Sequence, residues 1–282
     1  MYRAPLKDLL FVLNELLGPQ PLGQCPAHAD YSADLAESVL AASARFAEGV
    51  LDPINRSGDQ EGAHWSEDGV RTAQGFREAY RQFIAGGWQQ LRAPAHLGGQ
   101  GAPMLLATAA QETWASANLA FKLCPMLTYG AIHALEITAS PALKERYLPK
   151  MVTGEWTGTM VLTEPQAGSD LALIRTRAAP AGGDLAVDEF RLFGQKIFIT
   201  WGEHDLTDNI IHMVLARIDG APAGVRGISL FLVPKRLVGE DGALGARNDV
   251  RCVSIEHKLG IHASPTCHGL RPTRGRRRLS GG

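Results

Sequence analysis

The sequence predicts an α+β multidomain protein, in which an N-terminal all-α domain is followed by a middle domain of β-barrel or β-sandwich type. Three observations support this fold class. The chain has 282 residues, which is enough for roughly two domains. Apolar residues recur every three or four positions in the first half, and around Glu155 this period changes toward two. A helical block followed by a strand block indicates separate domains and not a βαβ alternation.

The helical half is marked by leucines and alanines at amphipathic spacing. The first run of leucines ends at Gly18-Pro19, a pair that stops a helix. The expected helices cover residues 6–17, 35–50, 72–84, 104–123 and 127–137. We therefore assign residues 1–30 to an N-terminal helical extension and residues 31–156 to an N-terminal α-helical domain.

The second half contains β-rich runs separated by turn residues. The expected strands cover residues 157–162, 189–193, 196–200, 210–218, 227–233 and 250–255. Turns are expected at Gly182-Gly183-Asp184 and Asp219-Gly220, and residues 238–248 have the composition of an exposed loop. Residues 157–267 therefore form the expected middle β domain.

Composition limits the class of protein. Apolar residues make up 45% and charged residues 20% of the chain, values that disfavour a disordered, collagenous or coiled-coil protein. No apolar run approaches the roughly 18 residues of a membrane span, and the N-terminus lacks the apolar core of a secretory signal. The four cysteines lie far apart, unlike a disulfide framework. We therefore expect a cytoplasmic protein with no membrane partner.

The C-terminal segment differs in charge from the rest of the chain. Residues 268–282 carry five arginines and no acid, whereas the remaining 23 bases face 29 acids and give the body a net charge of −6. An Arg-rich segment can bind nucleic acid, but this one has no aromatic residue for base stacking, and its Gly, Pro and Ser disfavour an ordered helix. We expect a basic, disordered tail and no nucleic-acid partner.

Motifs for other chemistries are weak. Gly98-Gly99-Gln100-Gly101 lacks the full G-x-G-x-x-G spacing and follows helical sequence, so we expect no dinucleotide loop there. Four potential zinc ligands recur at five-residue steps, whereas structural zinc sites bring their ligands in close pairs. We therefore expect no metal at Cys252, His257, His262 and Cys267.

The most informative segment runs from Met160 to Asp170, with the sequence MVLTEPQAGSD. A short apolar strand leads into Thr-Glu-Pro, after which Ala-Gly-Ser-Asp lets the backbone turn and present N–H and hydroxyl donors. A second apolar strand, Lys196–Thr200, also ends in a hydroxyl. A flat heteroaromatic ring needs an apolar bed and hydrogen-bond partners at its edge, and the two strand ends together offer both.

These segments resemble the acyl-CoA dehydrogenase family. The likeness rests on T-E-P-x-A-G-S-D at 163–170, G-Q-K-x-[FW]-I-T at 194–200 and P-x-x-x-G-G-x-G-x-P at 94–103, and it extends over about residues 30–267 in the family's order. Further segments are similar to the branch that contains 3-(methylthio)propanoyl-CoA dehydrogenases. These are residues 2–6, 202–205 and 256–260.

The resemblance implies a flavoenzyme. It implies FAD as cofactor, α,β-dehydrogenation of CH–CH groups in fatty or methylthio acyl-CoA substrates, and electron transfer to a flavoprotein acceptor. It also implies a C-terminal four-helix bundle after the two expected domains, and assembly as a homodimer or homotetramer.

The resemblance further assigns roles to single residues. Thr163 and Thr200 are expected at the polar edge of the flavin near N5 and O4, where donors stabilise the charge that the ring acquires on reduction. Ser169 is also expected to bind the acyl-CoA substrate or the pyrophosphate. Phe198 stands where many members have Trp, and Trp201 where Asn is frequent. The implied cofactor-binding residues are Met160, Leu162, Thr163, Gly168, Ser169, Phe198, Ile199 and Thr200.

The resemblance places the catalytic base, a glutamate, on the C-terminal bundle, so no catalytic residue is expected within this sequence. The likeness ends at Cys267 and the sequence then becomes basic and non-periodic, which favours a truncated, catalytically impaired chain without the bundle. Glu164 is expected to fix the Thr-Glu-Pro turn and Glu203 to lie in a loop. Two alternatives remain open: a non-catalytic flavin-binding module, including a DNA-binding relative of the alkylation-response flavoproteins, and an inert fragment.

Overall fold

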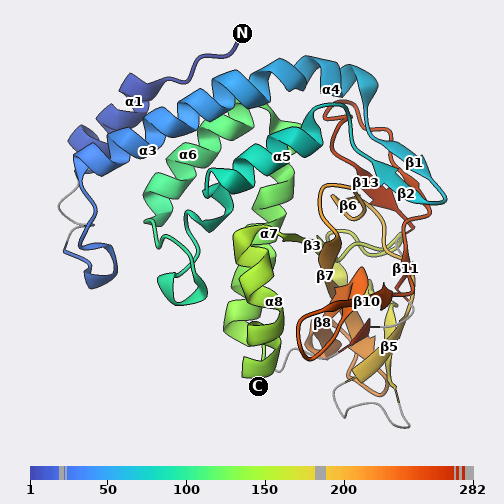
Figure 1. The fold of residues 1–282 in the computed structure, drawn as a ribbon. Coiled ribbons are helices and arrows are strands. Elements are labelled where there is room, and N and C mark those ends of the chain that lie inside the picture. Colours follow the sequence, from blue (N-terminus) through green and yellow to red (C-terminus); the bar gives the residue numbers. More distant parts are fainter. Residues whose placement is uncertain (19–21, 23, 182–188, 270, 273–274, 277–282) are drawn as a thin grey trace.

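The computed structural model describes residues 1–18, 22, 24–181, 189–269, 271–272 and 275–276. Its helices lie together on one side and its strands on the other, with α7 (Leu119–Thr138) between them (Figure 1). The predicted helical and β parts are therefore both present. After β3 (Trp156–Val161), the described residues form strands and 3-10 turns but no α-helix. Among the described helices, none is long and apolar enough to cross a membrane.

The helical part follows the predicted apolar spacing, with one boundary shifted. The other helices are α1 (Leu6–Phe11), α3 (Ala33–Phe46), α4 (Asn55–Glu61), α5 (Phe76–Ala85), α6 (Met104–Ala117) and α8 (Pro141–Thr153). The boundary expected between 123 and 127 lies instead at Asn118. Its side chain accepts a hydrogen bond from the Phe121 backbone N–H at 3.0 Å and so starts a new helix. Neither α4 nor α8 was predicted.

The helices share an aromatic core. The rings of Phe83 and Trp114 meet edge to face with centroids 5.2 Å apart, and Phe121 lies 5.8 Å from Phe83 in the same arrangement. Edge-to-face pairs of this kind contribute about 0.5–1.5 kcal/mol beyond the apolar area they bury. This core fixes the position of α7, which carries Phe121.

The main sheet has the strand order β15-β5-β4-β7-β3, and β8 also pairs with β7. Its further strands are β4 (Arg177–Pro180), β5 (Glu189–Phe193), β7 (Asn209–Ile218), β8 (Ile228–Pro234) and β15 (Gly275–Arg276). β3 runs parallel to β7, with Trp156 opposite Asn209 and Val161 opposite Val214. After Val161, the last residue of β3, the chain enters the Thr-Glu-Pro segment that carries the most informative motif of the sequence.

Smaller sheets surround the main one. β6 (Ile199–Thr200), β13 (Thr266–His268) and β12 (Ser254–Ile255) form a three-stranded sheet in the order β12-β13-β6. The two-stranded sheets are β1 (His64–Ser66) with β2 (Gly69–Arg71), β9 (Arg236–Val238) with β10 (Leu244–Arg247), and β11 (Val250–Arg251) with β14 (Arg271–Pro272).

Three expectations about the β part need correction. The segment 238–248, expected as a loop, contains β10, which pairs with β9. The strand expected over 196–200 is limited to Ile199–Thr200. Parts of the expected tail are paired, since β14 lies against β11 and β15 against β5. The predicted turn at 182–184 lies outside the described residues.

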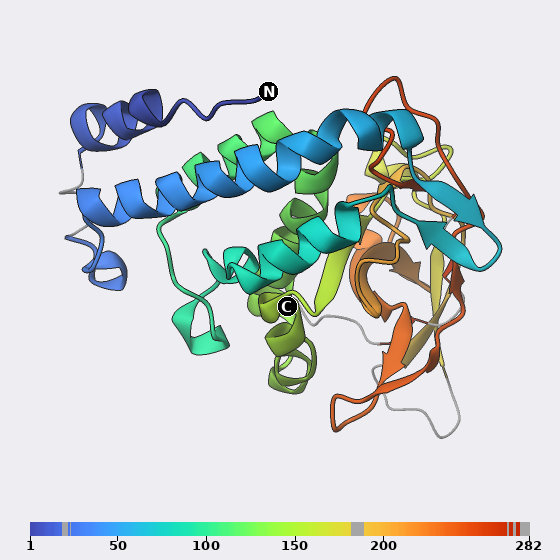
Figure 2. The same cartoon turned by 45° about the horizontal axis from the view of Figure 1, so that its top comes forward.

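The main sheet is covered on both faces. On one face, Ile211 and Met213 of β7 pack with Ile132 of α7 and Leu148 of α8. On the other face, Val214 packs in a second cluster that includes residues of β6 and β13. Figure 2 shows the helices gathered on one side of the strands. Residues near the end of β3 are therefore held between a helical layer and the smaller sheet.

Close approach of α7 to β3 depends on Gly158. A Cβ atom at this position would lie 2.5 Å from the Ala131 Cβ and 2.8 Å from the Met151 Cε. The Gly158 backbone N–H donates to the Thr128 hydroxyl at 3.1 Å. Glycine is required here because any larger side chain would push α7 away from the sheet.

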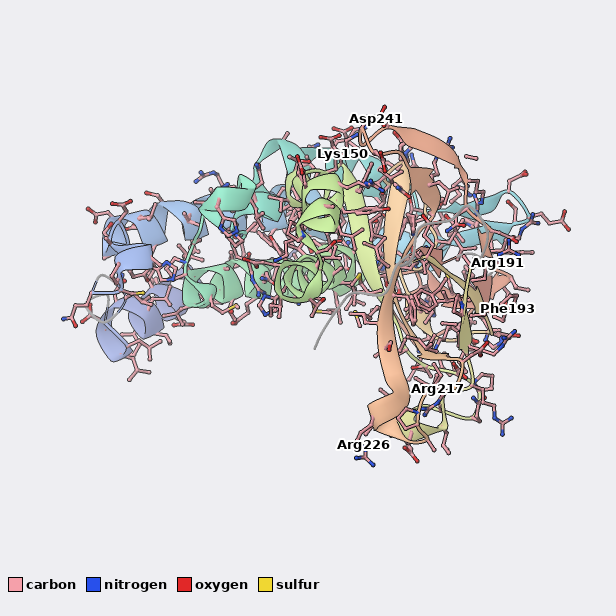
Figure 3. The ribbon with its side chains drawn as sticks, turned by 90° about the horizontal axis from the view of Figure 1, so that it is seen from below. Lys150, Arg191, Phe193, Arg217, Arg226 and Asp241 are labelled. Atoms are coloured by element: carbon pink, nitrogen blue, oxygen red, sulfur yellow. The ribbon has the colours of Figure 1, made fainter. Side chains whose placement is uncertain are left out.

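The sheet side turned away from the helices carries exposed side chains. Arg191 and Phe193 lie along β5 on that side, and Arg217 and Arg226 lie at one end of the β part, far from Asp241 at the other (Figure 3). The Arg177 guanidinium lies 4.7 Å from the centre of the Phe193 ring. This contact between Arg177 and Phe193 lies at the solvent surface and takes no part in the site described next.

Candidate functional site

The segment after β3 forms a tight turn. The Glu164 backbone N–H donates to the Ala167 carbonyl, and the Ala167 N–H donates back to the Glu164 carbonyl, both at 3.0 Å. The Asp170 carboxylate accepts from the Ala172 N–H at 3.0 Å and begins a short 3-10 turn. Gly168 and Ser169, between these two points, are exposed. The turn therefore presents its small residues to solvent, as the sequence predicted.

A buried ion pair anchors this turn to the second predicted segment. The Lys196 Nζ lies 2.8 Å from the Glu164 Oε1, and the two side chains are 0% and 3% exposed. The carboxylate also accepts from the backbone N–H groups of Arg175 and Thr176 and from the Gln166 amide. Burial opposes ionisation of Glu164, but these hydrogen bonds and Lys196 outweigh it and lower its pKa to about 2. Glu164 is therefore a fixed anion of the scaffold.

The same contacts bring the two threonine-bearing segments side by side. The Ile197 backbone N–H donates to the Thr163 carbonyl at 2.9 Å, and the Lys196 Nζ donates to the Leu162 carbonyl at 2.8 Å. The Thr200 carbonyl accepts from the Thr159 hydroxyl of β3 at 2.7 Å. Thr163, two residues after the end of β3, therefore lies beside Ile197, and Thr200, at the end of β6, lies beside Thr159 within β3. Among the described residues, neither threonine hydroxyl has a hydrogen-bond partner.

The remaining predicted site residues surround these two threonines in different ways. Met160 and Leu162 are half-buried, and Met160 packs toward the cluster that joins α7 and α8 to the sheet. Phe198 is 50% exposed, whereas Ile199 is 2% exposed because its side chain packs inside the sheet core. Phe198 can therefore offer an apolar surface to a ligand, and Ile199 can contribute only through its backbone.

Glu203 lies in the loop between β6 and β7, as the sequence predicted, but its side chain is buried there. It is 3% exposed, forms an ion pair with Lys235, and binds the Arg247 guanidinium at 2.9 Å. His212, nearby on β7, is 1% exposed, and burial together with the charge of Lys235 lowers its pKa to about 3. Sequence reasoning missed this network, because its four members come from four separate strands and loops and no local spacing connects them.

The two histidines among the four potential zinc ligands make other contacts. His262 lies between two carbonyl groups, with its Nδ1 3.1 Å from the Asp59 oxygen and its Nε2 2.8 Å from the Lys258 oxygen. The His257 ring stacks on it with centroids 4.9 Å apart. In the part of the chain that the structure describes, no group of three or more His, Cys, Asp or Glu is placed to hold a metal ion.

Comparison with known proteins supplies the family. Residues 36–155 match the acyl-CoA dehydrogenase N-terminal domain, and residues 159–269 match the acyl-CoA dehydrogenase middle domain. A 3-methylmercaptopropionyl-CoA dehydrogenase of Ruegeria pomeroyi is 47% identical over 265 residues, which are 94% of this chain and 44% of that protein. A butyryl-CoA dehydrogenase of Syntrophomonas wolfei is 37% identical over 269 residues, which are 94% of this chain and 43% of that protein.

Solved structures share the fold. An acyl-CoA dehydrogenase of Bacillus anthracis complexed with FAD superimposes with a TM-score of 0.67 at 22% identity, over 90% of this chain and 38% of that one. The chain spans less than half the length of the two relatives described above. Both of its parts match one family in that family's order, and the chain therefore belongs to the acyl-CoA dehydrogenase family.

Proposed function

We propose that this chain supplies the helical wall and the flavin-binding strands of an FAD-dependent acyl-CoA dehydrogenase. The observation that carries the proposal is that Thr163 and Thr200 lie on two segments joined by the 2.9 Å bond from the Ile197 N–H to the Thr163 carbonyl, and that both hydroxyls lack partners within the described chain. Two free hydroxyls beside an exposed aromatic ring fit the polar edge and the flat face of an isoalloxazine.

The site residues would each do one task. The hydroxyls of Thr163 and Thr200 would donate to the polar edge of the ring near N5 and O4, where negative charge develops on reduction. Phe198 covers an apolar part of the ring, and Gly168 and Ser169 leave room for phosphate or pantetheine groups with N–H and hydroxyl donors. When bound, FAD supplies the hydride acceptor for α,β-dehydrogenation. Met160 of β3 and Leu162, directly after it, line the same region.

The substrate and partners follow from the relatives. The 47% identical protein is named for a methylthio acyl-CoA and another for butyryl-CoA, so we infer a fatty or methylthio acyl-CoA substrate. A flavoprotein electron acceptor and a homo-oligomeric enzyme are proposed from the family resemblance alone. Glu164 is held ionised by four donors, and Glu203 is held by two cations. Neither carboxylate is free to act as base.

Titration with FAD tests the proposal. The purified protein is expected to quench FAD fluorescence on binding, and Thr163→Ala and Thr200→Ala are each expected to weaken binding about threefold to tenfold, because one hydrogen bond is lost. Thr153→Ala is the matched control, because its hydroxyl bonds to the Lys150 carbonyl at the end of α8. Absence of binding, or equal affinities in all variants, would contradict the proposal.

Anaerobic addition of acyl-CoA separates the rival functions. Bleaching of the bound flavin supports the dehydrogenase. Because no catalytic base is expected within this sequence, an unbleached flavin supports a flavin-binding module only if acyl-CoA also leaves the flavin absorption spectrum unchanged. Salt-dependent retention on DNA by that second form would favour the DNA-binding relative.

A further inference from the structure

The backbone around Thr200 is strained on both sides. Phe198 has φ of 57° and Trp201 has φ of 53°, in the left-handed region that bulky residues avoid. These two residues directly bracket β6, which is only Ile199–Thr200. Strain of this kind persists only where surrounding contacts impose it, and it is concentrated at functional sites.

Trp201 makes the contacts that impose this conformation. Its backbone N–H donates to the Pro265 carbonyl at 2.7 Å, and its indole Nε1 donates to the Ala120 carbonyl at 3.1 Å. The side chain is 1% exposed and stacks on Phe76 with centroids 6.4 Å apart. An indole from the β part is thus inserted into the core of the helical part and hydrogen-bonded there.

The Ala120 contact connects Thr200 to α7. Ala120 lies in the first turn of α7, and the same helix is fixed to β3 by the bond from the Gly158 N–H to the Thr128 hydroxyl. The Thr200 carbonyl, in turn, is held by the Thr159 hydroxyl of β3. Thr200 is therefore fixed between β3 on one side and, through Trp201, α7 on the other.

We propose that Trp201 is a positioning residue, which holds the Thr200 hydroxyl in its orientation toward the flavin edge through the indole bond to α7. This inference rests on the proposed FAD site. It follows that a displacement of α7 moves the Thr200 donor and changes how well the reduced flavin is stabilised. Trp201 itself touches Phe76 and His204 in the protein interior, so its effect on the flavin passes through Thr200.

Trp201→Phe removes the indole donor and keeps an aromatic ring against Phe76. Trp65→Phe is the matched control, because the Trp65 Nε1 donates to the Cys252 carbonyl at 3.0 Å on the exposed β1 hairpin. Trp201→Phe is expected to bind FAD about threefold to tenfold more weakly and to shift the flavin midpoint potential to a more negative value, whereas Trp65→Phe leaves both unchanged.

Hydrogen exchange provides a readout that needs no FAD. The Thr200 and Trp201 amides are expected to exchange faster in Trp201→Phe than in the wild type or in Trp65→Phe. If Trp201→Phe does not fold by circular dichroism, Thr159→Val removes the opposite support of Thr200 and is expected to give the same changes. If neither the wild type nor any variant binds FAD, the proposed function fails. The exchange rates still test whether the indole bond from Trp201 to the Ala120 carbonyl holds Thr200 in place. Unchanged exchange and unchanged potential would overturn the positioning role.

Discussion

The buried pair of Glu164 and Lys196 can be broken from one side by Lys196→Met. Methionine has a similar length but no charge, so the variant leaves the Glu164 carboxylate 3% exposed without its cation. It keeps the backbone donors of Arg175 and Thr176, which cannot neutralise the charge. We expect strong destabilisation, because removing one partner of a buried ion pair exposes the full desolvation cost of the other.

The size of the effect is set by the cost of leaving a buried carboxylate without its cation. Removing one partner of a buried ion pair costs about 3–5 kcal/mol. The Glu164 pKa, lowered from its ordinary 4.5 to about 2, is held down by Lys196 together with the donors of Arg175 and Thr176, so Lys196 accounts for part of that shift. At about 2–4 °C for each kcal/mol, Lys196→Met is expected to lower the melting temperature by roughly 6–20 °C.

The pH dependence of the melting temperature tests whether the unpaired Glu164 carboxylate causes the destabilisation. A carboxyl group with a depressed folded-state pKa stabilises the protein above its ordinary pKa of 4.5, and this contribution is lost as the pH falls toward 2. Thermal melts of wild type and Lys196→Met between pH 3 and pH 7 are expected to differ most at pH 7 and to converge in acid. The double variant Lys196→Met/Glu164→Gln should recover part of the loss. A pH-independent difference, or a loss below about 1 kcal/mol, would refute the reasoning.

Two further predictions concern contacts outside the threonine site. The His262 ring lies between two carbonyls, and the hydrogen bond to the Lys258 carbonyl, followed by those to Asp59, raises its pKa, because only the imidazolium donates from both nitrogens. The stabilisation that the charged His262 gives the fold is complete below its unfolded pKa of about 6.5 and is lost as the pH rises through the raised folded-state pKa. The melting temperature of His262→Gln should therefore fall below that of the wild type at pH 6 and approach it at pH 9. A difference in melting temperature that stays constant with pH would count against this. Gly158→Ala should lower the free energy of unfolding by about 1–3 kcal/mol, because the added methyl forces α7 away from β3. Gly130→Ala is the control: nothing lies within 4 Å of its added methyl, so it should be neutral or slightly stabilising. Equal denaturant midpoints for the two variants would contradict close packing at Gly158.

The periodicity of apolar residues was sufficient to predict a helical part followed by a β part. The strand expected at 189–193 is β5 as observed, and the strand expected at 210–218 differs from β7 by one residue. Long apolar runs report burial directly, so they predict such elements well. The short strands β6, β9 and β10 were shortened or missed, because their pairing depends on partners distant in the chain and not on local alternation.

The candidate site was predicted in part for the same reason. Thr163 and Thr200 each follow an apolar run, so each strand end was visible in the sequence. The contacts that join them, from Lys196 to Glu164 and from Trp201 to Ala120, cross 32 and 81 positions of the chain. Only the fold brings those residues together, and the strained conformation of Trp201 has no signature in the sequence.

The most direct test of the account is hydrogen exchange with and without FAD. If Thr163 and Thr200 flank the flavin, saturating FAD protects the backbone amides of 163–169 and 197–201 and leaves those of the β9–β10 hairpin unchanged. Protection confined to other segments, or no change in either, would contradict the assignment of the flavin to these two strand ends.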